Sequence, residues 1–153
     1  MGYGSLFSEE LITLDASYSS QEDLFRSAAK HLVDLGYIEE TYLNALMTRE
    51  KEFPTGLETQ YCNIAIPHTD APHIKHPFIY LVRLNENLQF KNMGDTESEV
   101  AVKIVMFLGI KNPKKQISLL SDLMEKFQEE KISRIILNGH DAKELETNLK
   151  EIF

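Results

Sequence analysis

The sequence Cys62-Asn63-Ile64-Ala65-Ile66-Pro67-His68-Thr69-Asp70 lies near the middle of the chain and carries its clearest local signal. Its first half contains β-branched residues and ends at Ile66, which is typical of a buried strand, and Pro67 then ends the strand because it has no N–H to donate. His68 is therefore predicted just beyond a strand end, where the sheet fixes the backbone and a loop leaves the ring accessible. Because a neutral imidazole nitrogen is a nucleophile, we expect His68 to carry a covalent group. The alternative is that His68 is an ordinary turn residue.

The composition limits the class of protein. With 153 residues, 42% of them hydrophobic and 26% charged, the chain is expected to form a single domain over residues 1–153. The formal net charge of -8 disfavours nucleic acids and anionic membranes as partners. No apolar run approaches the length of a membrane span and no secretory signal is visible, so we expect no membrane insertion and a cytoplasmic location. Cys62 is the single cysteine and is expected to pack as a small hydrophobe.

Hydrophobic spacing predicts strands and helices in alternation. Residues 1–8 are expected to be loose. Besides the strand before His68, strands are predicted at 10–15, 78–84 and 100–110, and the polar segment 85–98 is expected to be an exposed connection that can contain short extended pieces. Helices are predicted from a capping box at Ser19 and Glu22 to Gly36, at 39–51, from Asn112-Pro113 to about 130, at 132–137, and after a second capping box at Asp141 and Glu144. This order predicts an α/β sandwich, with helices flanking a central sheet.

Four residues are candidates for phosphoryl transfer: His68, Thr69, Arg49 and Gln116. The predicted elements place them at a strand end and two helix termini. A phosphoryl group needs a nitrogen nucleophile and donors for its oxygens; Arg49 offers a planar fork, Thr69 a hydroxyl and Gln116 an amide beside a helix N-terminus. The alternatives are that Arg49 only complements the end of its helix and that Gln116 is a solvated position.

Two other groups carry ligands or acids. His68, Asp70, His73 and His76 have the residue types of a metal site, but Pro72 and Pro77 interrupt the segment and its spacing matches no helical zinc signature. We therefore expect no metal. Three glutamates, Glu50, Glu52 and Glu58, could form a general acid and base, but neighbouring glutamates beside Lys51 are interpreted as a solvated face.

Several ordered motifs resemble the enzyme IIA components of the bacterial phosphoenolpyruvate-dependent sugar phosphotransferase system (PTS), in the mannitol and fructose superfamily. These motifs are Ala65-Ile66-Pro67-His68, with Arg49-Glu50 upstream and a helix start after Gly109-Ile110 downstream. The galactitol branch is the most similar, through Arg49-Glu50-Lys51-Glu52-Phe53-Pro54-Thr55-Gly56 and Asn112-Pro113-Lys114-Lys115-Gln116. The resemblance extends from about Leu6 to Phe153 and implies a mixed central sheet flanked by helices.

The resemblance also implies a function. His68 would accept a phosphoryl group from the histidine-containing phosphocarrier protein and pass it to a cysteine of enzyme IIB, without a cofactor, and Arg49 would help to hold the group. Thr69 stands where glycine is common, and Gln116 stands where mannitol-type members have a second active-site histidine. The transported compound would be galactitol or a related sugar or polyol. The alternative function is a regulatory phosphorylation switch, similar to the nitrogen-related members, and a metal-dependent hydrolase is a more distant one.

Overall fold

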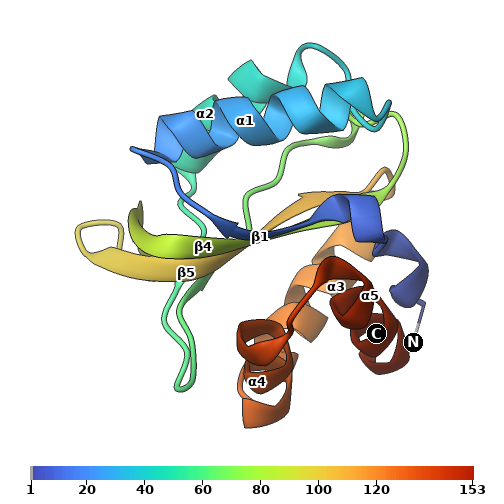
Figure 1. Ribbon diagram of the computed structural model, residues 1–153. Helices are drawn as coiled ribbons and strands as arrows, with labels where there is room; N and C mark the ends of the chain where they lie inside the picture. The colour runs from blue at the N-terminus through green and yellow to red at the C-terminus, as the bar shows by residue number, and fades with distance from the viewer. Residues whose placement is uncertain (1) are drawn as a thin grey trace.

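The computed structural model describes residues 2–153 and is built around one five-stranded mixed sheet (Figure 1). The strand order is β1-β4-β5-β3-β2. The central pair β4–β5 is antiparallel, β1 and β3 run parallel to their neighbours in that pair, and β2 is antiparallel to β3. The strands are β1 (Ile12–Ala16), β2 (Gly56–Leu57), β3 (Ile64–Ala65), β4 (Phe78–Lys91) and β5 (Glu99–Gly109). The expected mixed sheet flanked by helices is confirmed.

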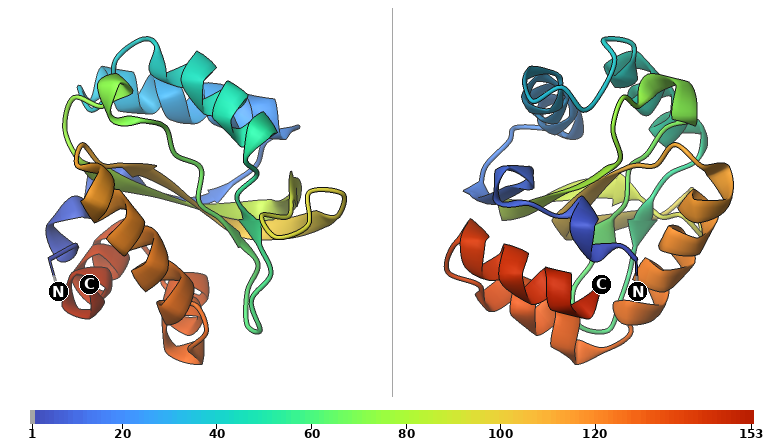
Figure 2. Two further views of the ribbon diagram at one scale, coloured as in Figure 1. Left: turned by 180° about the vertical axis from the view of Figure 1, so that it is seen from behind. Right: turned by 90° about the vertical axis from the view of Figure 1, so that its right-hand side faces the viewer.

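Helices cover both faces of the sheet (Figures 1 and 2). One face carries α1 (Gln21–Asp34) and α2 (Tyr42–Glu52), and the other carries α3 (Pro113–Lys126), α4 (Glu130–Asn138) and α5 (Ala142–Ile152). Successive side chains of a strand point to opposite faces, so β5 contributes Phe107 to the core under α1 and α2 and Met106 to the core under α3 to α5. The two apolar layers make the sandwich.

The helix ends follow the predicted capping chemistry, with one shift. At α3, the Asn112 side chain accepts hydrogen bonds from the backbone N–H groups of Lys114 and Lys115, as predicted. At α1, the prediction of Ser19 as the cap was wrong by one residue, because Ser20 accepts from the Asp23 N–H. The Asp23 carboxylate in turn accepts from the Ser19 N–H and hydroxyl, so it occupies the capping-box position that we had assigned to Glu22.

Two sequence expectations about exposed segments were wrong. Strand β4 continues to Lys91 through much of the segment expected to be a connection, because Leu88 and Phe90 alternate with polar residues and pair with Val102 and Val100 of β5. A register shift after Arg83 interrupts the ladder, and the polar outward residues hid the strand pattern.

The second wrong expectation was a loose start of the chain, because part of this segment is ordered and packed. Gly4–Leu6 forms a 3₁₀ helix, and Phe7 is buried with its ring centroid 5.3 Å from that of Phe153. This packing depends on the far end of the chain, which local sequence cannot indicate. Met1 lies outside the described residues.

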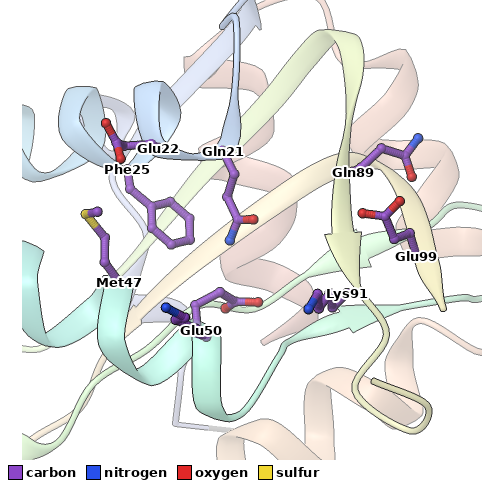
Figure 3. Close-up of a pocket in the computed structure, with 9 residues that line it drawn as sticks. Gln21, Glu22, Phe25, Met47, Glu50, Gln89, Lys91 and Glu99 are labelled. Carbon is purple, nitrogen blue, oxygen red and sulfur yellow. The ribbon is translucent and has the colours of Figure 1, made fainter. Parts of the chain in front are cut away.

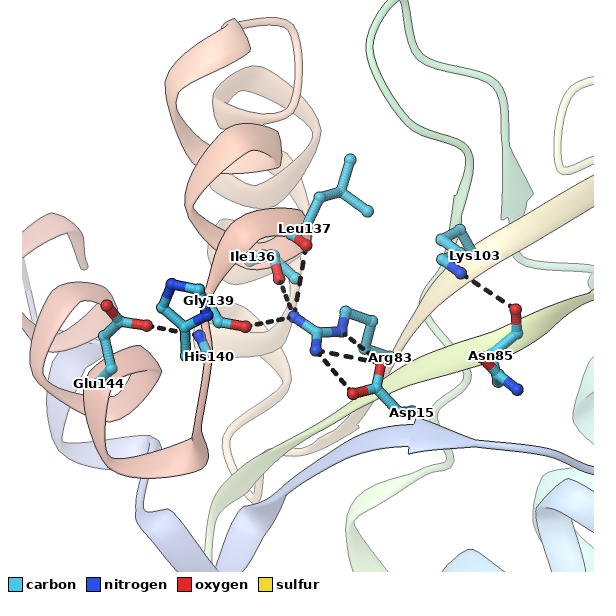
Figure 4. A network of polar contacts seen from close by, with 9 residues as sticks. All are labelled: Asp15, Arg83, Asn85, Lys103, Ile136, Leu137, Gly139, His140 and Glu144. Carbon is cyan, nitrogen blue, oxygen red and sulfur yellow. Dashed lines mark hydrogen bonds and ion pairs between the residues drawn. The ribbon is translucent and has the colours of Figure 1, made fainter.

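Arg83 is a buried cation on β4 that sequence spacing did not reveal (Figure 4). Its Nη1 donates to the carbonyl oxygens of Ile136 at 3.0 Å and Gly139 at 2.7 Å, at the end of α4. Its Nη2 donates to both oxygens of Asp15, each at 3.1 Å. Asp15 has φ 56°, a left-handed conformation that aspartate tolerates better than most residues. Arg83 therefore ties β1 and β4 to the C-terminal helices.

Candidate functional site

His68 lies just beyond the C-terminal end of β3. The backbone of His68 forms a parallel bridge with Leu108 of β5, and the Leu108 N–H donates to the Pro67 carbonyl at 3.0 Å. One residue earlier, the Ile66 N–H donates to the carbonyl of Thr55 at 3.3 Å. The predicted position just beyond a strand end is correct, and contacts with β5 on one side and with Thr55, just before β2, on the other hold the backbone there.

The His68 ring has a defined tautomer. Its Nδ1 lies 2.7 Å from the carbonyl oxygen of Ile66. Because a carbonyl oxygen only accepts hydrogen bonds, Nδ1 carries the hydrogen, and the lone pair of the neutral ring is on Nε2. Burial lowers the pKa of His68, and the charge of Arg49 lowers it further, whereas the hydrogen bond to Ile66 and the charge of Asp70 raise it. The neutral form of the ring is therefore favoured, with its lone pair on Nε2, and His68 as a whole is 7% exposed.

Arg49 lies on the last turn of α2 beside the loop that follows His68. Its Nη1 donates to Oδ1 of Asp70 at 3.0 Å, and its guanidinium carbon is 5.1 Å from the ring centroid of Phe53. Its Nε is buried and has no hydrogen-bond partner within residues 2–153. The guanidinium is thus oriented by a carboxylate and an aromatic ring, while its buried Nε–H stays without a partner among these residues. Sequence reasoning considered Asp70 only as a metal ligand and missed its pairing with Arg49.

Thr69 and Gln116 have different relations to His68. Thr69 is buried next to it, and its hydroxyl donates to the Asp70 carbonyl at 3.1 Å. Gln116 lies half-buried in the first turns of α3, which starts soon after the end of β5. Its side chain forms no hydrogen bond within residues 2–153, including none to His68. The structure therefore brings Arg49, Thr69 and Asp70 around the His68 loop, and it leaves Gln116 without a contact that ties it to the ring.

The other candidate groups have structural partners. Asp70 pairs with Arg49, and Nδ1 of His73 lies 2.8 Å from the Thr41 hydroxyl. Within residues 2–153, no three histidine, cysteine or acidic side chains lie close enough to hold a metal. Cys62 is buried as expected, and burial raises the pKa of its thiol to about 11, so it is a poor nucleophile.

Glu50 departs from the interpretation as a solvated face. It is 6% exposed, and its two carboxylate oxygens accept hydrogen bonds from the N–H and the hydroxyl of Thr55. The expectation failed because local charge density does not show that the Pro54-Thr55-Gly56 turn folds back beneath the end of α2. A threonine five residues after a glutamate at a helix end is the only local signal that pointed to this contact.

Comparison with known proteins identifies the family of this chain. The family profile described as "Phosphoenolpyruvate-dependent sugar phosphotransferase system, EIIA 2" matches residues 5–152. The galactitol-specific EIIA component of the PTS of Escherichia coli K12 is 34% identical over 137 residues, which cover 90% of this chain and 87% of that protein. The mannitol-specific phosphotransferase enzyme IIA component of Staphylococcus aureus N315 is 30% identical over 149 residues, which cover 95% and 96% of the two chains.

Solved structures share the fold. A chain in the complex of enzyme IIAMTL and phosphorylated enzyme IIBMTL from Escherichia coli superposes with a TM-score of 0.77 at 21% identity, covering 96% of this chain and 98% of that chain. None of the helices within residues 2–153 has the length and apolar character needed to cross a membrane. Since the family profile covers nearly the whole chain, the protein belongs to the EIIA 2 family of the phosphoenolpyruvate-dependent sugar phosphotransferase system and is a phosphoryl carrier of that system.

Proposed function

We propose that Nε2 of His68 accepts a phosphoryl group from the histidine-containing phosphocarrier protein and passes it to a cysteine of enzyme IIB in the cytoplasm. The observation that carries this assignment is the 2.7 Å contact of Nδ1 with the Ile66 carbonyl, which leaves Nε2 as the free nitrogen of a neutral ring. A ring that a hydrogen bond holds in one orientation loses less rotational freedom when it reacts than a ring that rotates freely.

The transfer balances without a metal or a cofactor. The Nε2 lone pair forms a bond to phosphorus as the phosphorus–nitrogen bond of the donor breaks, and the donor nitrogen keeps the bonding electrons. The phosphorylated ring retains the hydrogen on Nδ1 and is cationic, so the Ile66 carbonyl accepts a stronger, charge-assisted hydrogen bond from it. A cysteine thiolate of enzyme IIB then attacks the same phosphorus and returns the neutral ring.

Three side chains would bind the phosphoryl oxygens. Arg49 would donate from its unused Nε and from Nη1 once this atom leaves Asp70. Thr69 would donate its hydroxyl after it releases the Asp70 carbonyl. Gln116 would supply an amide donor from α3, whose N-terminus adds positive potential. Of the three, Arg49 is best supported, because a buried donor without a partner is costly unless a ligand satisfies it.

The assignment of partners and substrate draws on the relatives. The similarity to the galactitol-specific component supports galactitol or a related polyol as the transported compound. The Escherichia coli complex, which contains phosphorylated enzyme IIBMTL, supports an enzyme IIB as the acceptor.

Labelling tests the proposal directly. Incubation with radiolabelled phosphoenolpyruvate, enzyme I and the phosphocarrier should give one acid-labile phosphate per chain, and His68→Ala should abolish it. The matched control is His73→Ala, since His73 is half-buried nearby and contacts Thr41, and it should retain the label. Label that persists in His68→Ala would refute the assignment. Transfer of the label to a galactitol-type enzyme IIB separates transport from the alternative of a regulatory switch, in which the label is accepted but not passed on.

A further inference from the structure

Glu50 is a buried carboxylate whose partners are polar but uncharged. Both of its oxygens accept from Thr55, Oε1 from the hydroxyl at 2.7 Å and Oε2 from the backbone N–H at 2.8 Å. No lysine or arginine within residues 2–153 forms an ion pair with it. Burying a carboxylate without a cation is unfavourable, so the site keeps Glu50 at a cost in stability.

The surroundings of Glu50 account for the raised pKa of its carboxyl group (Figure 3). It lines a pocket with Phe25 of α1, and the charged side chains around this pocket are Glu22, Lys51, Lys91 and Glu99. Burial raises the pKa of Glu50 to about 7, although the two hydrogen bonds from Thr55 oppose the shift. Either protonation state can bind Thr55, because a protonated carboxyl still accepts from the N–H and can donate to the hydroxyl oxygen.

Thr55 connects Glu50 to the phosphoryl-accepting ring. The carbonyl of Thr55 accepts from the Ile66 N–H at 3.3 Å, and the carbonyl of Ile66 accepts from Nδ1 of His68 at 2.7 Å. Next to the Thr55–Ile66 contact, Gly56 pairs with Ala65 across β2 and β3. A chain of three hydrogen-bonded contacts therefore runs from the end of α2 to His68, and the residues that make these contacts are all buried.

We propose that Glu50 is a positioning residue for phosphoryl transfer: it holds Thr55 so that the Ile66 carbonyl stays on Nδ1 of His68 and Nε2 stays free. The inference rests on the assignment of His68 as the phosphoryl acceptor. Arg49 precedes Glu50 on the same turn, so the same residue also fixes the helix end that presents the guanidinium to the site. Without Glu50, the buried Thr55 N–H loses its acceptor, and the turn has to move to satisfy it.

The test uses the tautomer of His68 as a readout that fold stability alone does not change. In long-range ¹H–¹⁵N spectra of the full chain with labelled histidine, wild type should show the Nδ1–H form. Glu50→Leu fills the space but accepts no hydrogen bond, so it should shift His68 toward the Nε2–H form. Glu50→Gln can accept from the Thr55 N–H and donate to its hydroxyl, so it should restore the wild-type spectrum.

Kinetics give a second readout. With the phosphocarrier as donor, the saturated labelling rate of Glu50→Leu should fall about tenfold with an unchanged half-saturating donor concentration, because the ring and not the docking surface is altered. The matched control Glu52→Leu replaces an exposed glutamate of the same helix and should behave as wild type. A wild-type tautomer and rate in folded Glu50→Leu would overturn the inference.

A folding failure of Glu50→Leu does not end the test. Thr55→Val removes one of the two hydrogen bonds to Glu50 and Thr55→Ser retains both, so the valine variant should show the tautomer shift and the serine variant should not. Identical spectra for these two variants would overturn the inference. If wild type takes no label while the tautomer still depends on Glu50, the assignment of His68 as the phosphoryl acceptor has failed, whereas a labelled wild type whose tautomer does not depend on Glu50 overturns this inference alone.

Discussion

Arg49 donates to Asp70 across the loop that follows His68, with Nη1 and Oδ1 3.0 Å apart. In the unphosphorylated protein this contact occupies Nη1, one of the two donors that the phosphoryl group would use. The Asp70 side chain is 77% exposed, so its attraction for Arg49 is weak and a phosphoryl group can displace it. Under the proposed function, Asp70 and the phosphoryl group would therefore compete for one guanidinium.

Asp70→Asn should favour the phosphorylated state. An exposed ion pair contributes roughly 0.2 to 1 kcal/mol, so removing this competitor should raise the equilibrium ratio of phosphorylated to free protein by up to about fivefold. The substitution should also lower the pKa of His68, because the Asp70 charge raises it. Equilibration with the labelled phosphocarrier measures the ratio, and NMR titration measures the pKa. Asp70→Glu, which keeps the charge, serves as the control, and an unchanged ratio in Asp70→Asn would show that the two do not compete.

Arg49 should contribute through its geometry as well as its charge. A charge-assisted hydrogen bond contributes about 1.5 to 3 kcal/mol, or about ten- to a hundredfold in rate, and lysine keeps the charge but loses the fork. We expect Arg49→Ala to lose far more of the transfer rate than Arg49→Lys. Rapid-quench labelling measures both variants, with the neighbouring exposed Lys51→Ala as the control. Equal rates for wild type and Arg49→Ala would limit Arg49 to ending its helix.

Local signals predicted the parts of the site that depend on local chemistry. Pro67 after an apolar run placed His68 at a strand end, and Asn112 before Pro113 placed the start of α3. Burial at long range was not predictable in the same way. Phe7 packs on Phe153 and Glu50 is covered by a folded-back turn, and neither contact leaves a periodic pattern in the sequence.

Wild type should lose stability relative to Glu50→Gln as the pH rises. Burial raises the pKa of Glu50 from 4.5 to about 7, so between these values the folded state binds more protons than the unfolded state and the free energy of unfolding falls with pH. The free energy of unfolding that wild type loses across this pH range is about 3 kcal/mol. Urea unfolding of both proteins at pH 5, 6, 7 and 8 isolates this contribution, because the other carboxylates are common to both. Parallel stability curves would show that Glu50 titrates normally.

Arg83 should be important for stability and not for phosphoryl transfer. Removing one partner of a buried ion pair costs about 3 to 5 kcal/mol, and since the Asp15 side chain is 66% exposed we expect Arg83→Met to fall near the lower limit. Urea unfolding checks this value, and the labelling rate per folded chain should be unchanged. Arg134→Met removes an exposed pair with Glu130 on α4 and should cost much less stability than Arg83→Met. Similar losses for both variants would contradict a special role for the buried cation.

Gln116 tests whether α3 contributes a donor to the phosphoryl group. One hydrogen bond to a charged group contributes roughly 1.5 to 3 kcal/mol, so Gln116→Leu should slow transfer about ten- to a hundredfold if the bond forms in the transition state. The fold should survive, because Gln116 is half-buried near the start of a helix that Asn112 caps. Gln116→His should retain transfer and gain a pH dependence near neutrality, since a protonated imidazole donates better than a neutral one. Pulse labelling of the purified variants from pH 6 to 8 decides between the two roles: an unchanged rate in Gln116→Leu would place this residue outside the site.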